Sequence, residues 1–198
     1  MSNSTSTSSR FDRKKEETRE KVKRAYVDLL HQKSYEDITV REIAAEAGIG
    51  YKTYYRHYAD KSALSQAILN DLWLEFIPHI EAPASRDAVG KTLRRILIFV
   101  SEHARTIRAL TRTPALNDVP QPILQYGLAD ALKIEEQTGD PVLDQKRNEL
   151  IAMQFVYGQF NMVRWWLEND MVLPLDDMVA LISHMVIEPI WTLPSVNE

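Results

Sequence analysis

The stretch that decides the fold is residues 39–58, TVREIAAEAGIGYKTYYRHY, which contains two short helical patterns joined by a turn. Thr39 and Glu42 have the spacing of a capping box, in which each side chain reaches the backbone N–H of the other residue. Gly48 ends this first helix, because the turn needs a residue that readily adopts a positive φ. A second helix follows and is expected to extend to about Tyr58. Two short helices around a glycine-containing turn predict a helix-turn-helix.

The two predicted helices have an inner and an outer face. Small residues at Ala44 and Ala47 allow the helices to cross closely, and Ile43 provides an apolar anchor. Tyr54 and Tyr58 are four residues apart, so both can face inward. The residues left for the outer face are polar or aromatic: Tyr51, Lys52, Thr53, Tyr55, Arg56 and His57. Such a face suits a helix that enters a DNA major groove about 12 Å wide.

Residues 38–64, ITVREIAAEAGIGYKTYYRHYADKSAL, resemble the DNA-binding signature of the TetR/AcrR family of bacterial transcriptional regulators. The similarity also covers the preceding helical pattern, roughly residues 13–64. Gly50 departs from the family pattern, which often has serine at that position. The resemblance implies an all-helical homodimer that has a three-helix DNA-binding head and a larger C-terminal domain for an effector.

The resemblance also implies a role for individual positions in the head. Thr39 and Arg41 match positions that meet the phosphate backbone or the edge of the groove. The base-reading positions at the front of the second helix correspond to Tyr51, Lys52 and Thr53. Phosphate contacts correspond to Tyr55, His57 and Lys61, whereas Arg56 matches a position that meets either a base or a phosphate. Base contacts would specify the site, and phosphate contacts would position the protein on it.

Several of these residues have an ordinary structural explanation as well. Thr39 can serve only as a helix cap, and Tyr51 and Tyr55 can be packing tyrosines. Lys61 can be an exposed lysine in the first turn of the next helix. The basic run at residues 13–15 is better explained as a solvated face than as a set of phosphate contacts.

The rest of the chain also shows helical patterns, and no alternation of apolar and polar residues predicts a strand. Asp60 is suited to cap a helix, and an amphipathic pattern follows from Val89 to Ile107. Asp140 followed by a proline predicts the start of a long helix. A last helix is expected to be capped by Asp176. The predicted fold class is therefore all-α.

The order of these patterns predicts three segments. Seven of residues 2–9 are Ser or Thr, which predicts a disordered tail over residues 1–12. Residues 13–60 are expected to form the helix-turn-helix DNA-binding domain. Residues 61–198 are expected to form a helical domain for ligand binding and dimerisation.

The charged residues are distributed unevenly along the chain, which the net charge alone does not show. The 198 residues have a formal net charge of −4, which alone would disfavour a nucleic-acid partner. Residues 1–61 contain 13 basic and 10 acidic side chains, whereas the remainder contains 11 basic and 18 acidic ones. This asymmetry suggests two different functions in one chain, although it can also arise by chance.

Composition and missing motifs exclude several other classes. The chain has no cysteine, which excludes disulfides, zinc–thiolate sites and cysteine nucleophiles. No apolar run is long enough to span a membrane and the N-terminus lacks an apolar signal region, so we expect a cytoplasmic protein. The five histidines lack metal-binding spacing, and no nucleophile motif is present. We therefore expect neither an enzyme nor a cofactor or metal site.

The last two helical patterns carry more apolar residues than one helical face can bury. The resemblance implies that they form the dimer interface, a bundle of two helices from each copy. Gly158 can permit close approach of a helix, or it can accommodate a tryptophan within the protomer. The candidate interface residues are Leu150, Ile151, Gly158, Met162, Trp166, Leu181, Ile182, Met185 and Ile187.

An effector pocket is expected among the helices between about Asp60 and Asp170. Most aromatic residues there can equally be ordinary core, and Asn161 can face solvent. The acidic balance of this part of the chain weakly favours a neutral or cationic ligand. The candidate lining residues are Trp73, Phe76, Phe99, His103, Tyr126, Tyr157, Asn161 and Trp165.

These observations favour a ligand-responsive regulator, most often a repressor in families of this type. It is expected to bind a near-palindromic operator as a homodimer and to be released by a small-molecule effector. The first alternative is a helical ligand-binding protein whose head no longer reads DNA. The second is an enzyme on a helical scaffold, which no arrangement of residues supports.

Overall fold

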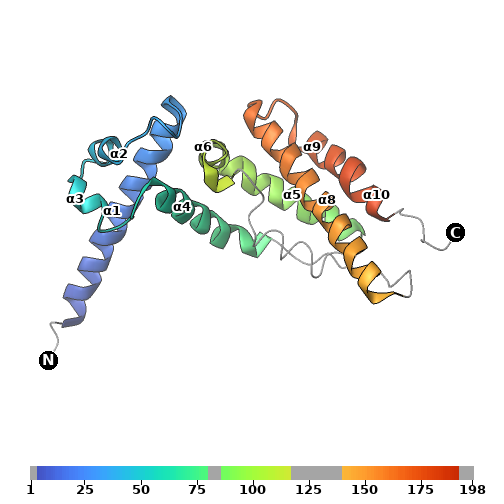
Figure 1. Ribbon diagram of the computed structural model, residues 1–198, viewed down its shortest axis with the longest axis horizontal. Helices are drawn as coiled ribbons and strands as arrows, with labels where there is room; N and C mark the ends of the chain where they lie inside the picture. Colours follow the sequence, from blue (N-terminus) through green and yellow to red (C-terminus); the bar gives the residue numbers. More distant parts are fainter. Residues whose placement is uncertain (1–3, 80–85, 117–139, 192–198) are drawn as a thin grey trace. The chain divides into compact units, whose positions relative to one another are not determined.

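The computed structural model describes residues 4–79, 86–116 and 140–191, and every regular element in these ranges is a helix (Figure 1). The chain divides into two compact units. The head unit contains Met1–Trp73 and Arg105–Asn117, and the second unit contains Leu74–Ala104 and Asp118–Glu198. The all-α prediction is confirmed. The predicted functional boundary after residue 60 stays a prediction, since compactness does not test function.

Four helices provide most of the head unit: α1 (Ser4–Gln32), α2 (Val40–Glu46), α3 (Tyr51–Tyr54) and α4 (Lys61–Phe76), the last of which continues beyond it (Figure 1). α1 begins at Ser4, whereas the apolar pattern predicts a start at Arg13. Once a helix exists, each further residue adds a hydrogen bond at little extra cost, so a polar segment can extend it.

The core of the head unit joins α1 to α4 through a polar contact as well as apolar packing. The Tyr26 hydroxyl lies 2.7 Å from the Ser65 hydroxyl, and both side chains are buried. Nearer the surface, Lys23 on α1 and Asp71 on α4 form an ion pair of 2.6 Å. The largest fully buried side chains of this unit are Tyr26, Leu30, Ile38, Ile43, Tyr54, Leu64 and Leu110.

α6 (Ala104–Leu110) and η2 (Pro114–Leu116) complete the head unit, although they are distant from it in sequence. Arg105 pairs with Asp28 of α1 at 2.6 Å. Its backbone carbonyl lies 3.1 Å from the imidazole of His31. The sequence predicts one continuous helix through this region, but the chain breaks at His103, between α5 (Arg86–Glu102) and α6.

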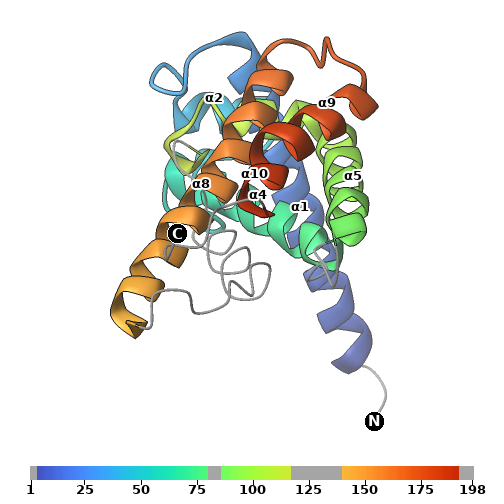
Figure 2. The same ribbon diagram turned by 90° about the vertical axis from the view of Figure 1, so that its right-hand side faces the viewer.

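The second unit consists of α5, η1 (Ile77–His79), α8 (Pro141–Glu168), α9 (Leu175–Ile182), the π-helix η3 (Ser183–Ile187) and α10 (Glu188–Trp191). α5 packs against α9, and α8 packs against η3 (Figure 2). The fully buried side chains of this unit are Leu93, Leu97, Leu167, Met178 and Ile182.

The starts of α8 and α9 test two predicted caps. Asp140 caps α8 as expected, because its carboxylate accepts from the backbone N–H groups of Val142 and Leu143 at 2.9 and 3.3 Å. The cap predicted at Asp176 is wrong, since the N-cap of α9 is Pro174 and Asp176 lies in the first turn. There its carboxylate pairs with Arg94 of α5, and a negative charge is also favourable near a helix N-terminus.

Candidate nucleic-acid interface

The start of α2 is fixed by the predicted capping box. The Glu42 N–H donates to the Thr39 hydroxyl at 3.3 Å, and the Glu42 carboxylate accepts from the Thr39 N–H at 2.9 Å. Lys33 also donates to this carboxylate. The hydrogen bonds from Lys33 and Thr39 together lower the pKa of Glu42 to about 2. The capping role of Thr39 is therefore confirmed, and its contact with DNA stays a prediction.

Stability should depend on the charge of Glu42 over a defined pH range. The contribution of the box should be complete above the ordinary pKa of 4.5 and lost as the pH falls through about 2. Thr39→Ala should lower the free energy of unfolding by about 1 kcal/mol at pH 7. Glu42→Gln should remove the part of the free energy of unfolding that depends on pH in this range. Urea unfolding at pH 7, 4 and 2.5 measures both effects. Glu46→Gln, on an exposed residue of the same helix, is the control, and an identical pH profile in Glu42→Gln would contradict this account.

The turn between α2 and α3 is built as the sequence predicts. Gly48 adopts φ 65°, a conformation that favours glycine, and the Ile49 N–H returns to the Ala44 carbonyl at 2.9 Å. Gly50 then provides the N-cap of α3 without a side-chain hydrogen bond. α3 ends at Tyr54 rather than near Tyr58, because the following N–H groups turn back to nearer carbonyls, as in the 3.2 Å bond from Arg56 to Thr53.

The inner face of α3 anchors this short helix to the head. Tyr54 and Tyr58 are buried, as predicted, and the Tyr54 hydroxyl donates to the Asp60 carbonyl at 3.0 Å. Burial raises the pKa of both tyrosines, so both remain neutral. A helix of four residues has little stability of its own, so these buried rings hold the outer face in place.

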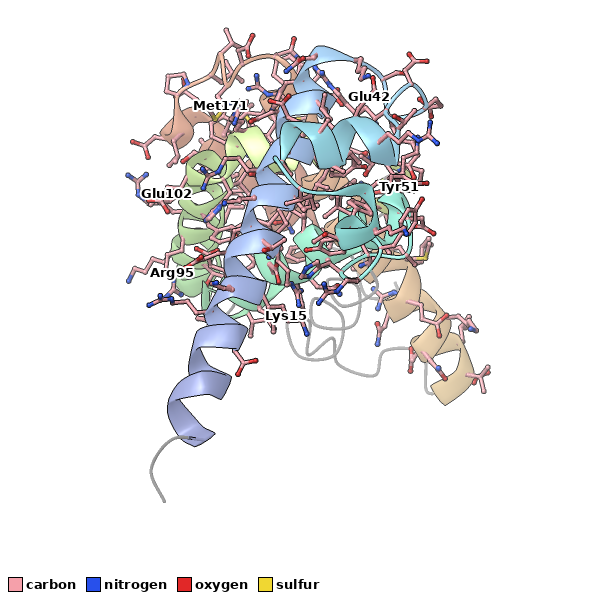
Figure 3. The ribbon with its side chains drawn as sticks, turned by 90° about the vertical axis from the view of Figure 1, so that its left-hand side faces the viewer. Lys15, Glu42, Tyr51, Arg95, Glu102 and Met171 are labelled. Atoms are coloured by element: carbon pink, nitrogen blue, oxygen red, sulfur yellow. The ribbon has the colours of Figure 1, made fainter. Side chains whose placement is uncertain are left out.

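The outer face presents two tyrosines that act as one unit. Tyr51 and Tyr55 are 44 % and 45 % exposed, their rings meet edge to face at 4.9 Å, and their hydroxyls lie 3.0 Å apart. The Arg41 guanidinium lies 5.6 Å from the centre of the Tyr51 ring. Figure 3 shows Tyr51 on α3 beside α2. Tyr55 also meets the buried Tyr54 ring edge to face at 5.6 Å, so the pair is held against the core while nearly half of each side chain stays exposed to a ligand.

The remaining predicted contact residues differ in exposure. Lys52 and Arg56 are exposed, whereas Thr53 and His57 are half-buried. Burial and the nearby Lys15, Arg19 and Arg56 lower the pKa of His57. The face therefore has a positive local charge, although the whole chain is acidic.

Lys61 has a different environment from the other predicted contacts. Its ammonium group donates to the backbone carbonyls of Tyr35, Glu36 and Ile38, the last two at 3.2 and 3.1 Å. It also lies 4.2 Å from the centre of the Tyr35 ring. These three carbonyls use all three ammonium hydrogens. The structure therefore gives Lys61 the role of tying the start of α4 to the segment before α2, and the predicted phosphate contact is not supported.

Replacing Lys61 should consequently affect stability more than DNA binding. Lys61→Met keeps the chain length but leaves three carbonyls without their donor, which should cost about 1–3 kcal/mol in unfolding experiments. Lys52→Met, on an exposed residue, should leave stability nearly unchanged. The salt dependence of DNA binding should keep its slope in Lys61→Met. If Lys61→Met instead kept the stability of the protein and reduced the salt-dependence slope by about one charge, the predicted phosphate contact of Lys61 would be supported.

Residues 24–68 match the family model described as bacterial regulatory proteins of the tetR family, and this segment runs from α1 through α3 into α4. This segment belongs to the tetR family of bacterial regulatory proteins. It forms the capping box, the turn and the exposed tyrosine pair described above.

The curated relatives of this chain are regulators by name. An uncharacterised HTH-type transcriptional regulator of Bacillus subtilis is 34 % identical over 76 residues, which are 38 % of this chain and 20 % of the relative. A Mycobacterium bovis protein of the same description is 31 % identical over 133 residues, 59 % of this chain and 64 % of the relative. The matches thus span less than two thirds of these relatives. They agree on a transcriptional regulator, a class that is generally not enzymatic.

Solved structures confirm the fold of this chain. A TetR transcriptional regulator from Streptococcus agalactiae has a TM-score of 0.62 at 20 % identity, over 90 % of this chain and 98 % of that one. The dihydroxyacetone kinase operon activator DhaS has a TM-score of 0.55 at 16 % identity, with the same coverage of both chains. The likeness shows a helical DNA-binding head with a larger helical domain.

The residues predicted for the dimer interface separate into two groups. Leu150 and Met185 are 68 % and 62 % exposed, Leu181 is exposed, and Ile151 and Met162 are half-buried. In contrast, three of them are buried in the core of the second unit: Trp166, Ile182 and Ile187. This corrects their assignment to a free face. Their helices carry apolar residues on more than one side, and sequence alone does not distinguish the two sides.

Gly158 also has a role within the protomer. A Cβ atom at Gly158 would lie 3.2 Å from both methyl carbons of Val186 on η3. The close approach that it permits is therefore between α8 and η3 of one chain. This agrees with the predicted close approach of a helix, and no tryptophan is among the nearest atoms, whereas a contact of Gly158 with a second copy stays a prediction.

The predicted effector-pocket residues are not gathered at one described site. Phe99 is buried, and its ring centre lies 4.3 Å from that of His103 and 5.3 Å from that of Phe76. Trp73 belongs to the head unit and Tyr157 is half-buried. Asn161 and Trp165 are exposed, and Tyr126 lies outside the described residues. The effector site stays a prediction.

Among residues 4–79, 86–116 and 140–191, no group of three or more His, Asp and Glu side chains could hold a metal ion. No helix in the same ranges is long and apolar enough to cross a membrane.

Proposed function

We propose that this TetR-family regulator is a sequence-specific repressor that binds a near-palindromic operator as a homodimer and is released by a small-molecule effector. The observation that carries the proposal is the outer face of α3. There an exposed tyrosine pair and exposed Lys52 and Arg56 surround a short helix that is anchored by buried Tyr54 and Tyr58. A rigidly held polar face with a positive local charge is suited to a major groove.

In this proposal the residues of the head divide into two kinds of contact. Tyr51, Lys52 and Thr53 at the start of α3 would meet base edges, since this end of a recognition helix points into the groove. Contacts with phosphates would come from Arg41 of α2 and from the residues that follow α3: Tyr55, Arg56 and His57. Thr39 lies at the start of α2, where its second lone pair can still accept from a group at the edge of the groove.

The dimer would use exposed apolar residues of the second unit. Leu150 and Met153 on α8 are exposed, as are Leu181 on α9 and Met185 on η3. α8 packs against η3, so these helices lie side by side within the protomer. Exposed large apolar residues on neighbouring helices are suited to a bundle formed with a second copy.

A two-fold dimer would place two α3 helices in successive major grooves, about 34–36 Å apart. Selection of bound sequences from a random DNA library tests this directly. We expect enrichment of a two-fold symmetric site whose half-sites are one helical turn apart or a multiple of it. A protein that enriches no sequence would instead support the alternative of a ligand-binding protein whose head no longer reads DNA.

Release by an effector would follow from coupling between the head and residues 61–198. The coupling is reciprocal, so operator DNA must weaken effector binding by the same factor as the effector weakens operator binding. The acidic balance of this part of the chain favours a neutral or cationic effector.

Lys52→Ala should relax base preference at one position in each half-site. If Lys52 donates to a base edge, its loss should cost about 1–3 kcal/mol of discrimination at that position and much less on random DNA. Competition binding with operators substituted one base pair at a time measures the effect. Lys14→Ala, on an exposed residue of α1, serves as the matched loss of a positive charge. Equal losses on specific and random DNA in Lys52→Ala would assign it to a phosphate.

A further inference from the structure

The side chain of Tyr51 is held from two sides, although nearly half of it is exposed. Its ring meets that of Tyr55 edge to face, with 4.9 Å between the ring centres, and the two hydroxyl oxygens lie 3.0 Å apart. The Arg41 guanidinium lies over the Tyr51 ring, 5.6 Å from its centre. Tyr55 is fixed in turn against buried Tyr54, whose ring centre lies 5.6 Å away. These contacts favour one orientation of the Tyr51 side chain.

Arg41 reaches Tyr51 from a different helix, because it lies in the first turn of α2 and Tyr51 is the first residue of α3. The neighbouring carboxylate of Glu42 is engaged by Lys33 and Thr39 instead. A guanidinium that stacks on a ring keeps its N–H donors in the plane of the group, where they can meet a phosphate. Arg41 can therefore contact the DNA backbone and hold Tyr51 at the same time.

The hydrogen bond between Tyr51 and Tyr55 limits what the two hydroxyls can offer to DNA. One hydroxyl donates to the other, so the pair keeps one free O–H for a further acceptor. The hydrogen bond to Tyr51 raises the pKa of Tyr55, as is expected when Tyr55 is the donor. The free O–H is then that of Tyr51, at the position where a base contact is proposed. A hydroxyl that also accepts a hydrogen bond is the stronger donor.

We propose that Arg41 is a positioning residue for base recognition, because its guanidinium holds the Tyr51 ring so that the Tyr51 hydroxyl meets an acceptor atom on one base edge in each half-site. The inference rests on the proposed DNA binding and deepens it. It gives Arg41 an effect on sequence preference in addition to its phosphate contact, and it places that effect at the base pair that Tyr51 reads.

The sizes of these interactions set the expected effects. Loss of one base contact should remove about 5- to 150-fold of preference at its position, so Tyr51→Ala should have an effect of that size. An exposed cation–π contact is weaker, so Arg41→Gln should remove about two- to fivefold of the same preference. Loss of a phosphate contact alone should weaken binding to all sequences alike.

The test is competition anisotropy of the full chain with an operator selected from a random library and with operators substituted one base pair at a time. Tyr51→Ala identifies the position that Tyr51 reads. Arg41→Gln should lose preference at that same position and keep it at the others. The double variant should lose no further preference there, because Arg41 acts through Tyr51. Circular dichroism establishes that each variant is folded.

Arg56→Gln is the matched control, since it removes an exposed arginine from the same face. Among the described residues, the cations that lie over a tyrosine ring are Arg19, Arg41 and Lys61. Arg56→Gln should therefore weaken binding to all the operators by a similar factor. If Arg41→Gln gave the same uniform loss, Arg41 would contact only a phosphate and the inference would be overturned. An unchanged base preference in Tyr51→Ala would overturn it as well.

A second arm observes the same contacts without DNA. NMR measurement of the Tyr51 χ1 torsion should show one rotamer in the unmodified protein and averaging in Arg41→Gln. Tyr51→Phe should lower the pKa of Tyr55, since it weakens the hydrogen bond that raises it. A Tyr51 rotamer that Arg41→Gln leaves unchanged would overturn the inference. Failure to bind any DNA, with the change of rotamer present, would overturn the proposed function and leave the positioning contact in place.

Discussion

Tyr54→Ala is expected to destabilise the head unit by about 3–5 kcal/mol and to abolish operator binding. Tyr54 is fully buried, its ring contacts those of Tyr55 and Tyr58 at 5.6 and 5.9 Å, and truncation would leave a cavity beneath the outer face of α3. A loss of this size is a large part of the stability of a typical domain. Thermal unfolding and anisotropy with operator DNA measure the two effects.

Tyr54→Phe is the matched control. It keeps the ring and removes only the hydroxyl that donates to the Asp60 carbonyl, so we expect a loss of about 1 kcal/mol and retained operator binding. If Tyr54→Ala were as stable as Tyr54→Phe, the buried tyrosines would not be what anchors α3. Operator binding by Tyr54→Ala would lead to the same conclusion.

Leu150→Asp combined with Met185→Asp is expected to convert the dimer into monomers and to lower operator affinity about 10²–10⁴-fold. Both side chains are more than 60 % exposed in the protomer, so the substitutions should change its stability little. In a two-fold dimer four carboxylates would be buried at the interface, which is costly without partners. Sedimentation velocity and anisotropy measure the two outcomes.

Val172→Asp provides the control for this pair. Val172 is also an exposed apolar residue of the second unit, but it lies between α8 and α9 and not on the proposed face. We expect it to leave the dimer intact. A dimer that persists in the double variant would move the interface elsewhere, and a monomer in Val172→Asp would extend the interface to the segment between the two helices.

The sequence predicts the head best where a local rule decides the structure. The Thr39–Glu42 capping box, the positive φ of Gly48 and the inward direction of Tyr54 and Tyr58 each depend on residues within about four positions of one another. Such short-range geometry is set by hydrogen bonds and helical periodicity. The same reasoning identifies Asp140 as the cap of α8.

Features that depend on distant segments could not be predicted in the same way. The role of Lys61 comes from carbonyls more than 20 positions away, and no motif indicates that contact. α6 joins the head unit through Asp28, which is likewise remote in sequence. The early end of α3 depends on competition among nearby carbonyls, and periodicity does not resolve it.

The face chosen by an apolar helix is also set by long-range packing. Ile182 and Leu181 are adjacent and both aliphatic, yet the first is fully buried and the second is exposed. In the second unit, α9 packs against α5. The sequence alone does not show which side of α9 is buried by this packing. The predicted interface therefore contained both core and surface residues. The environment of His57 is a similar case, since Lys15 and Arg19 come from a different helix.

The most direct test of the central claim is an anisotropy titration of the purified protein against the DNA upstream of its own gene, with random DNA of equal length as the control, at two salt concentrations. We expect strong preference for the upstream fragment, and affinity that falls steeply as the salt concentration rises. Weak and equal binding to both DNAs, followed by no enrichment from a random library, would contradict it. The head would then not read DNA sequence, and the function would reside in the second unit.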